Sequence, residues 1–210
     1  MLDSALSRSP AIQRVQSIVA RALFRIGMTA GAATIAGAAA GVLAGIFFST
    51  GAIARGIVSL AVSAGLDAID GTIARQCAAP SAIGGVLDLC CDRIVEAAVI
   101  VGIAWPRPEL YLPAFVLVAT WYINITVFLA VGAALSNRGP KLIEYPPGIL
   151  ERSEALVFLA VLAISGAWPL TREIGPLLCY AFAGLEMVTG AQRLMFGYRI
   201  LSVAGDENAN

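Results

Sequence analysis

The sequence predicts an all-α, polytopic membrane protein with six transmembrane helices, preceded by an N-terminal amphipathic helix at the membrane surface. Of the 210 residues, 59% are hydrophobic and only 13% are charged, whereas roughly a quarter of a soluble domain is charged. The mean hydropathy is +0.82. The chain also divides into successive apolar runs close to the ~20 residues that a bilayer-spanning helix needs.

Residues 1–27 are expected to lie on the membrane rather than across it. Beyond Pro10, apolar and basic side chains alternate at helical spacing. The apolar ones are Ile12, Val15, Val19 and Leu23, and the basic ones are Arg14, Arg21 and Arg25. Such a helix binds an anionic membrane surface; the alternative is a basic helix packed on the protein's own loops. The segment lacks the order of a secretory signal.

Six apolar runs separated by short polar turns follow. We expect spans at about 29–49, 52–75, 81–105, 111–135, 149–168 and 176–196. The first is rich in Gly and Ala, which allow close approach between helices. The predicted organisation is therefore a surface helix (1–27), one six-span domain (28–202) and a polar tail (203–210).

The distribution of Lys and Arg predicts the orientation. With six spans and the N-terminus inside, eleven of the 14 basic residues fall on the inner side and three, Arg55, Arg107 and Arg172, on the outer side. Positive charge gathers on the cytoplasmic side of membrane proteins. We therefore expect cytoplasmic termini in a bacterial inner membrane or its equivalent.

The composition also limits the chemistry. The formal net charge is zero, which argues against a nucleic-acid partner. The chain has no His, so acid–base and metal chemistry must use carboxylates, which favour Mg²⁺, Ca²⁺ or Mn²⁺. The four Cys form no C-x-x-C pair and are interpreted as small buried hydrophobes.

Four aspartates lie at the expected cytoplasmic ends of the second and third spans. Asp67 and Asp70 share one helical face, and Asp88 and Asp92 lie one turn apart on the next span. The short connection predicts antiparallel neighbours whose carboxylates converge. Four ionised carboxylates need cations between them, and two divalent ions would suit displacement at phosphorus. Inert charges at the membrane surface are the alternative, but ionisable residues within spans are usually functional.

The residues of this stretch read D-x-x-D-G-x-x-A-R, then eight residues, then G-x-x-x-D-x-x-x-D. They are Asp67, Asp70, Gly71, Ala74, Arg75, Gly84, Asp88 and Asp92. This pattern resembles the signature of the CDP-alcohol phosphotransferase family at every fixed position. The resemblance implies a membrane enzyme, expected to be a homodimer, that moves a phosphatidyl group from CDP-diacylglycerol to an alcohol and releases CMP.

The same resemblance implies roles for individual residues. The four aspartates would bind two Mg²⁺ ions, or Mn²⁺, and Asp92 would also be the general base. The nucleotide would contact Gly71, Ala74, Arg75 and Gly84. Relatives often carry Pro-Asn or Pro-Asp where this chain has Ala30 and Gly31, so any nucleotide contact made there by the Asn or Asp side chain is missing.

The acceptor is less strongly indicated. Arg138, Lys141 and Arg152 lie on the side of the site and would suit an acceptor with its own phosphate, such as an inositol phosphate or glycerol 3-phosphate; they are equally explained as topology markers. The pieces G-x-x-E-R (148–152) and T-x-x-Q-R (189–193) resemble phosphatidylinositol-phosphate synthases. Glu96 would either position the acceptor or pair with Arg93 or Arg152.

Two other functions remain open at this point. A membrane prenyltransferase also binds diphosphate through Mg²⁺ and Asp-rich helices, and a cation transporter could use carboxylates within the membrane, although near its midplane. CMP release from a CDP-linked lipid is expected only of the phosphotransferase.

Overall fold

The computed structural model describes residues 9–77, 81–136, 150, 152–167 and 173–207. Its regular elements are all helical, as the sequence predicts. They are α2 (Pro10–Arg25), α3 (Ala30–Ser49), α4 (Ile53–Gln76), α5 (Ala82–Ala104), the 3₁₀ turn η1 (Pro108–Leu110), α6 (Tyr111–Ser136), α7 (Arg152–Ser165) and α9 (Ile174–Glu207). Each predicted apolar run overlaps one helix; in chain order these are α3, α4, α5, α6, α7 and α9.

Local chemistry explains several helix boundaries. Thr29 caps α3 by accepting a hydrogen bond from Ala32 N, and Ser81 caps α5 by accepting one from Gly84 N. Between α3 and α4 the chain turns at Gly51, whose φ of 75° favours glycine. Residues 197–207 contain no proline, and α9 continues past the expected end of the last span, through Glu207 and into the segment predicted as a polar tail.

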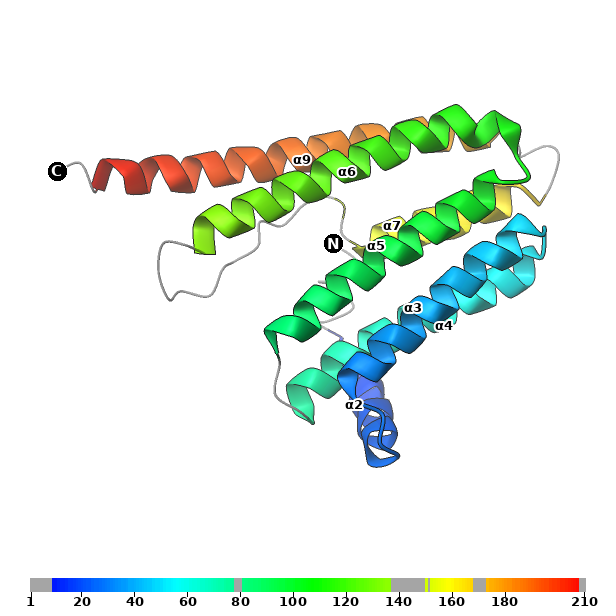
Figure 1. Ribbon diagram of the computed structural model, residues 1–210, viewed down its shortest axis with the longest axis horizontal. Coiled ribbons are helices and arrows are strands. Elements are labelled where there is room, and N and C mark those ends of the chain that lie inside the picture. Colours follow the sequence, from blue (N-terminus) through cyan, green and yellow to red (C-terminus); the bar gives the residue numbers. More distant parts are fainter. Residues whose placement is uncertain (1–8, 78–80, 137–149, 151, 168–172, 208–210) are drawn as a thin grey trace.

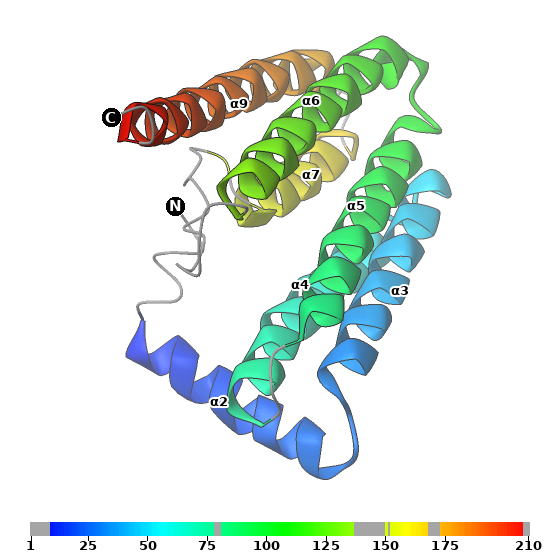
Figure 2. The ribbon, with the colours of Figure 1, turned by 60° about the vertical axis from the view of Figure 1, so that its left-hand side comes forward.

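The helices form two groups that meet along α5 and α7. Helix α3 packs against both α4 and α5, while α6 and α9 lie side by side along most of their length (Figure 1). Helix α7 contacts α4, α5 and α9. Helix α2 lies across the end of α4, at a steep angle to the other helices (Figure 2).

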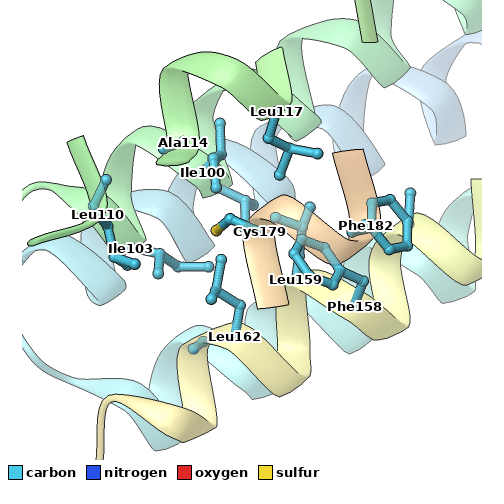
Figure 3. Packing of buried hydrophobic residues seen from close by; sticks show 14 of the residues in the cluster. Ile100, Ile103, Leu110, Ala114, Leu117, Phe158, Leu159, Leu162, Cys179 and Phe182 are labelled. Carbon is cyan, nitrogen blue, oxygen red and sulfur yellow. The ribbon is translucent and has the colours of Figure 1, made fainter. Parts of the chain in front are cut away.

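One apolar core joins the two groups. Its buried side chains include Ile100 and Ile103 of α5, Leu117 of α6, Leu159 of α7 and Cys179 of α9 (Figure 3). The rings of Phe158 and Phe182 stack with centroids 4.1 Å apart. Cys91 and Cys179 are buried free thiols, as predicted, whereas Cys90 is exposed.

A glycine seam on α3, formed by Gly37, Gly41 and Gly45, sets the distance between α3 and its neighbours. A Cβ at Gly45 would lie 2.3 Å from the carbonyl oxygen of Ala98, and one at Gly102 would lie 2.0 Å from the carbonyl oxygen of Gly45. Backbone therefore meets backbone where α3 crosses α5, as in other membrane helix pairs with small residues at their interface.

In the described part of the chain, the lengths of the helices and their exposed apolar side chains are those of a membrane protein. Four segments are long and apolar enough to cross a bilayer: Ala30–Ser49, Ile53–Gln76, Pro108–Leu135 and Ile174–Ser202. Large apolar side chains on the outer faces are exposed, among them Phe115 (73%) and Leu177 (68%). The number of spans beyond these four stays a prediction.

Candidate active site

Three of the four predicted aspartates converge. Asp67 and Asp70 lie on α4 and Asp88 on α5, and each offers one carboxylate oxygen within 4.8 Å of the others. Spacing i, i+3 places the first two on one face of α4, and α5, which packs on α3 as α4 does, brings the third close to them. The expected convergence of carboxylates from adjacent helices is therefore present.

Arg152, the first residue of α7, contacts this acidic cluster. Its Nη1 donates to Asp67 and lies 3.8 Å from Asp88 Oδ1, and its Nη2 lies 2.6 Å from Asp92 Oδ1. Asp92, one turn beyond Asp88, is thus connected to the cluster through Arg152. The guanidinium group supplies positive charge that closely spaced carboxylates require.

Thr34 of α3 holds Asp70 in place. Its Oγ1 lies 2.6 Å from Asp70 Oδ2 and 3.0 Å from the carbonyl oxygen of Ala30. A hydroxyl has one proton to donate, and the carboxylate is the closer and charged acceptor, so the bond to Asp70 is the stronger. Both side chains are buried, which restricts this carboxylate to one orientation.

The cluster fits a divalent metal. All its donors are carboxylate oxygens, the ligands that Mg²⁺ and Mn²⁺ prefer. Asp88 Oδ1 is buried and has no hydrogen-bond partner among the described residues. Arg152 Nη1, at 3.8 Å, is too far to donate a hydrogen bond to it. A buried oxygen without a hydrogen bond is costly, and a cation held with Asp67 and Asp70 would satisfy it.

A cavity of about 380 Å³ opens beside Asp70 and Asp88. All four residues expected to contact the nucleotide, Gly71, Ala74, Arg75 and Gly84, line it. A Cβ at position 71 would lie 3.0 Å from Arg75 Nη1, so glycine leaves room for that guanidinium. Ala30 and Gly31 form part of the wall, and neither has a polar side chain that could hydrogen-bond a ligand.

The helix ends add to the electrostatics of this cavity. Helices α3 and α5 both begin at its wall. The positive ends of their dipoles, together with Arg75, make it a favourable place for a diphosphate.

A second cavity, of about 180 Å³, lies on the Arg152 side of the acidic cluster. Three arginines line it: Arg93 of α5, Arg152 of α7 and Arg193 of α9. Two buried carboxylates, Glu96 and Glu186, line it as well. Glu96 pairs with Arg93 at 2.6 Å, one of the two roles expected of it. We call this the arginine cavity.

Sequence reasoning found part of this arrangement. Of the three residues expected at the acceptor site, Arg152 lines the arginine cavity, while Arg138 and Lys141 lie outside the described residues. Arg93 and Arg193 were not among the predicted site residues. Arg93 follows Asp92 directly, and Arg193 is the last residue of the T-x-x-Q-R piece, and these positions are the signal that could have identified them. Glu186 was missed too, although an acidic residue within an apolar run indicates function.

Taken together, these features define a class: a polytopic helical membrane protein with a carboxylate metal site between a cavity suited to a diphosphate and a cavity lined by arginines. The model of the CDP-alcohol phosphatidyltransferase family matches residues 27–189. The chain therefore belongs to the CDP-alcohol phosphatidyltransferase family, which confirms the expected resemblance and its reaction class, a transferase of substituted phosphate groups in phospholipid synthesis.

Individual relatives are similar to this protein over most of the chain. The chain is 32% identical to a phosphatidylinositol phosphate synthase of Mycobacteroides abscessus, over 92% of this chain and 87% of that protein. It is 29% identical to an archaetidylinositol phosphate synthase of Pyrococcus horikoshii, over 88% and 92% of the two chains.

Solved structures give the same picture. The crystal structure of Mycobacterium tuberculosis phosphatidylinositol phosphate synthase with CDP-DAG bound superposes with a TM-score of 0.73, at 25% identity and over 88% of this chain and 94% of that one. The same synthase in complex with manganese and citrate gives a TM-score of 0.71, at 25% identity and over 87% and 88% of the two chains.

Proposed function

We propose that this protein transfers a phosphatidyl group from CDP-diacylglycerol to an inositol phosphate, with release of CMP. The observation that carries the choice of acceptor is the arginine cavity: guanidinium groups of Arg93, Arg152 and Arg193 line it, and Arg152 connects it to the acidic cluster. Guanidinium is the side-chain group best matched to phosphate. The named activities of the relatives support the same acceptor.

The donor would occupy the cavity beside Asp70 and Asp88. Its nucleotide would contact Gly71, Ala74, Arg75 and Gly84, while its acyl chains remain in the bilayer. The aspartates would hold two Mg²⁺ ions, or Mn²⁺, in agreement with the manganese complex of the M. tuberculosis synthase. Bound divalent ions would neutralise the diphosphate and the charge that develops as CMP leaves.

Asp92 is the proposed general base. It takes the proton of the acceptor hydroxyl, whose oxygen forms a bond to the lipid-side phosphorus while the bond from that phosphorus to the CMP oxygen breaks. Its contact with Arg152, a residue that lines the arginine cavity, supports this role, because the acceptor is proposed to bind in that cavity.

We propose six spans, formed by α3 to α7 and α9, with cytoplasmic termini and active site. Helix α5 has 23 residues, long enough to cross, and its charged residues belong to the site. Helix α2 would lie on the membrane surface, since Val15 and Ile18 are 61% and 57% exposed. The protein is further proposed to be a homodimer, on the family resemblance.

The test is CMP release by the purified protein with CDP-diacylglycerol and Mg²⁺. Inositol 1-phosphate, glycerol 3-phosphate, free inositol and serine are offered separately, and release with inositol 1-phosphate is expected to be far faster than with any of the others. Release only with glycerol 3-phosphate would refute the acceptor and keep the reaction. Absence of release with every acceptor would reopen the prenyltransferase and transporter alternatives.

A further inference from the structure

A chain of polar side chains crosses the interface between α6 and α9. Trp121 Nε1 donates to Glu186 Oε1 at 3.2 Å, and Asn124 Nδ2 donates to Glu186 Oε2. Asn124 Oδ1 accepts a hydrogen bond from Arg193 Nη1 at 2.8 Å. Trp121, Asn124 and Glu186 are at most 8% exposed. We call these four residues the polar relay.

The hydrogen bonds of the relay can be donated in one direction only. A carboxylate only accepts hydrogen bonds in its ionised form, and an indole or a guanidinium only donates. The amide of Asn124 must therefore turn its NH₂ group to Glu186 and its oxygen to Arg193. The opposite orientation would oppose oxygen to carboxylate and NH₂ to guanidinium. Glu186 thus sets the orientation of Asn124, and Asn124 sets the position of Arg193.

The relay ends at the arginine cavity. All four of its members line that cavity, and the Arg193 guanidinium also lies over the ring of Phe128, 5.1 Å from its centroid. A hydrogen bond along one edge and an aromatic ring against the face hold a planar guanidinium firmly. Arg152, by contrast, is engaged with the aspartates.

We propose that Glu186 and Asn124 are positioning residues that hold the Arg193 guanidinium toward the phosphate of the acceptor. The relay then determines selection for phosphorylated over unphosphorylated acceptors. This inference rests on the proposed function, since it assumes an acceptor phosphate in the arginine cavity. The competing explanation is that these hydrogen bonds only stabilise the packing of α6 against α9.

The test uses the direction of the relay. Glu186→Gln has nearly the same size but lets the Asn124 amide turn its NH₂ group toward Arg193. Loss of one charge-assisted hydrogen bond should raise the KM for inositol 1-phosphate about tenfold. The turnover at saturation and the KM for CDP-diacylglycerol should stay unchanged. Asn124→Asp alone opposes two carboxylates and should raise the acceptor KM at least as much.

The double variant Glu186→Gln with Asn124→Asp exchanges acid and amide and restores a consistent direction. The new aspartate accepts from Arg193 and from the new glutamine, whose oxygen accepts from Trp121. It should bring the acceptor KM back to within about threefold of wild type. Thr126→Val is the matched control, because Thr126 lies exposed on α6 and, within the described part of the chain, bonds only to the Tyr122 carbonyl oxygen of its own helix.

The preference for inositol 1-phosphate over free inositol, as the ratio of the two kcat/KM values, should fall in each single variant and recover in the double variant. If the hydrogen bonds only stabilise the packing of α6 against α9, the single variants should instead lower both kcat/KM values together. Wild-type turnover combined with unchanged acceptor KM in both single variants would overturn the relay alone. No turnover of inositol 1-phosphate by the wild-type protein would overturn the proposed function and, with it, the relay's role.

Discussion

The glycine seam offers a sharp test of how helix spacing controls the acidic cluster. A carbon atom and a carbonyl oxygen approach each other to about 3.3 Å, whereas a Cβ at Gly45 would lie 2.3 Å from the Ala98 oxygen. The substitution Gly45→Ala therefore requires α3 and α5 to separate by about 1 Å. Helix α3 carries Thr34, which holds Asp70, and α5 carries Asp88.

A displacement of that size at a catalytic site costs up to about 100-fold in rate, and overpacking costs about 1–3 kcal/mol of stability. We expect Gly45→Ala to lower kcat for CMP release by about 10- to 100-fold and to lower the Tm in detergent. Gly65→Ala is the matched control, because a Cβ at Gly65 meets no atom within 4 Å. Equal turnover of the two variants would refute a role for the seam in spacing the carboxylates.

Three further predictions concern the acidic cluster. Asp92→Asn should lower kcat by at least about 100-fold while CDP binding, measured by calorimetry, stays close to wild type; retained turnover would remove Asp92 as the base. Thr34→Val should weaken Mn²⁺ binding, followed by electron paramagnetic resonance, about tenfold, and Thr34→Ser should restore it; equal affinity in both variants would mean that the hydroxyl does not hold Asp70. Chelation with EDTA should reduce CMP release to background, and added Mg²⁺ or Mn²⁺ should restore it; release that survives chelation would rule out a required metal.

The helices and the carboxylate cluster could be predicted because both depend on local spacing. Asp67 and Asp70 share a face by helical periodicity alone, and a short connection fixes the neighbouring helix that brings Asp88 opposite them. The ends of α5 followed in the same way from Ser81 and Trp105, which flank its apolar run. Each of these inferences needed only residues that are close in sequence.

The rest of the site depends on contacts between distant segments, which one sequence does not reveal. Asn124 and Arg193 are separated by 69 residues, and Thr34 and Asp70 by 36. Trp121 lies within an apolar run, and periodicity cannot show that its indole N–H meets Glu186, 65 residues further along the chain. The arginine cavity likewise forms only when α5, α6, α7 and α9 pack around it.

Helix α5 separates the two proposed substrate sites, and this arrangement suits an in-line displacement at phosphorus. Asp88 lines the cavity proposed for the nucleotide, whereas Leu89, Arg93 and Glu96 of the same helix line the arginine cavity. Displacement at phosphorus places the attacking and leaving oxygens roughly in line, so donor and acceptor must reach the phosphorus from opposite sides. Asp92 lies on this dividing helix, one turn from Asp88 and in contact with Arg152. A base at that point can take the proton of the incoming hydroxyl while remaining on the side of the phosphorus away from the departing CMP.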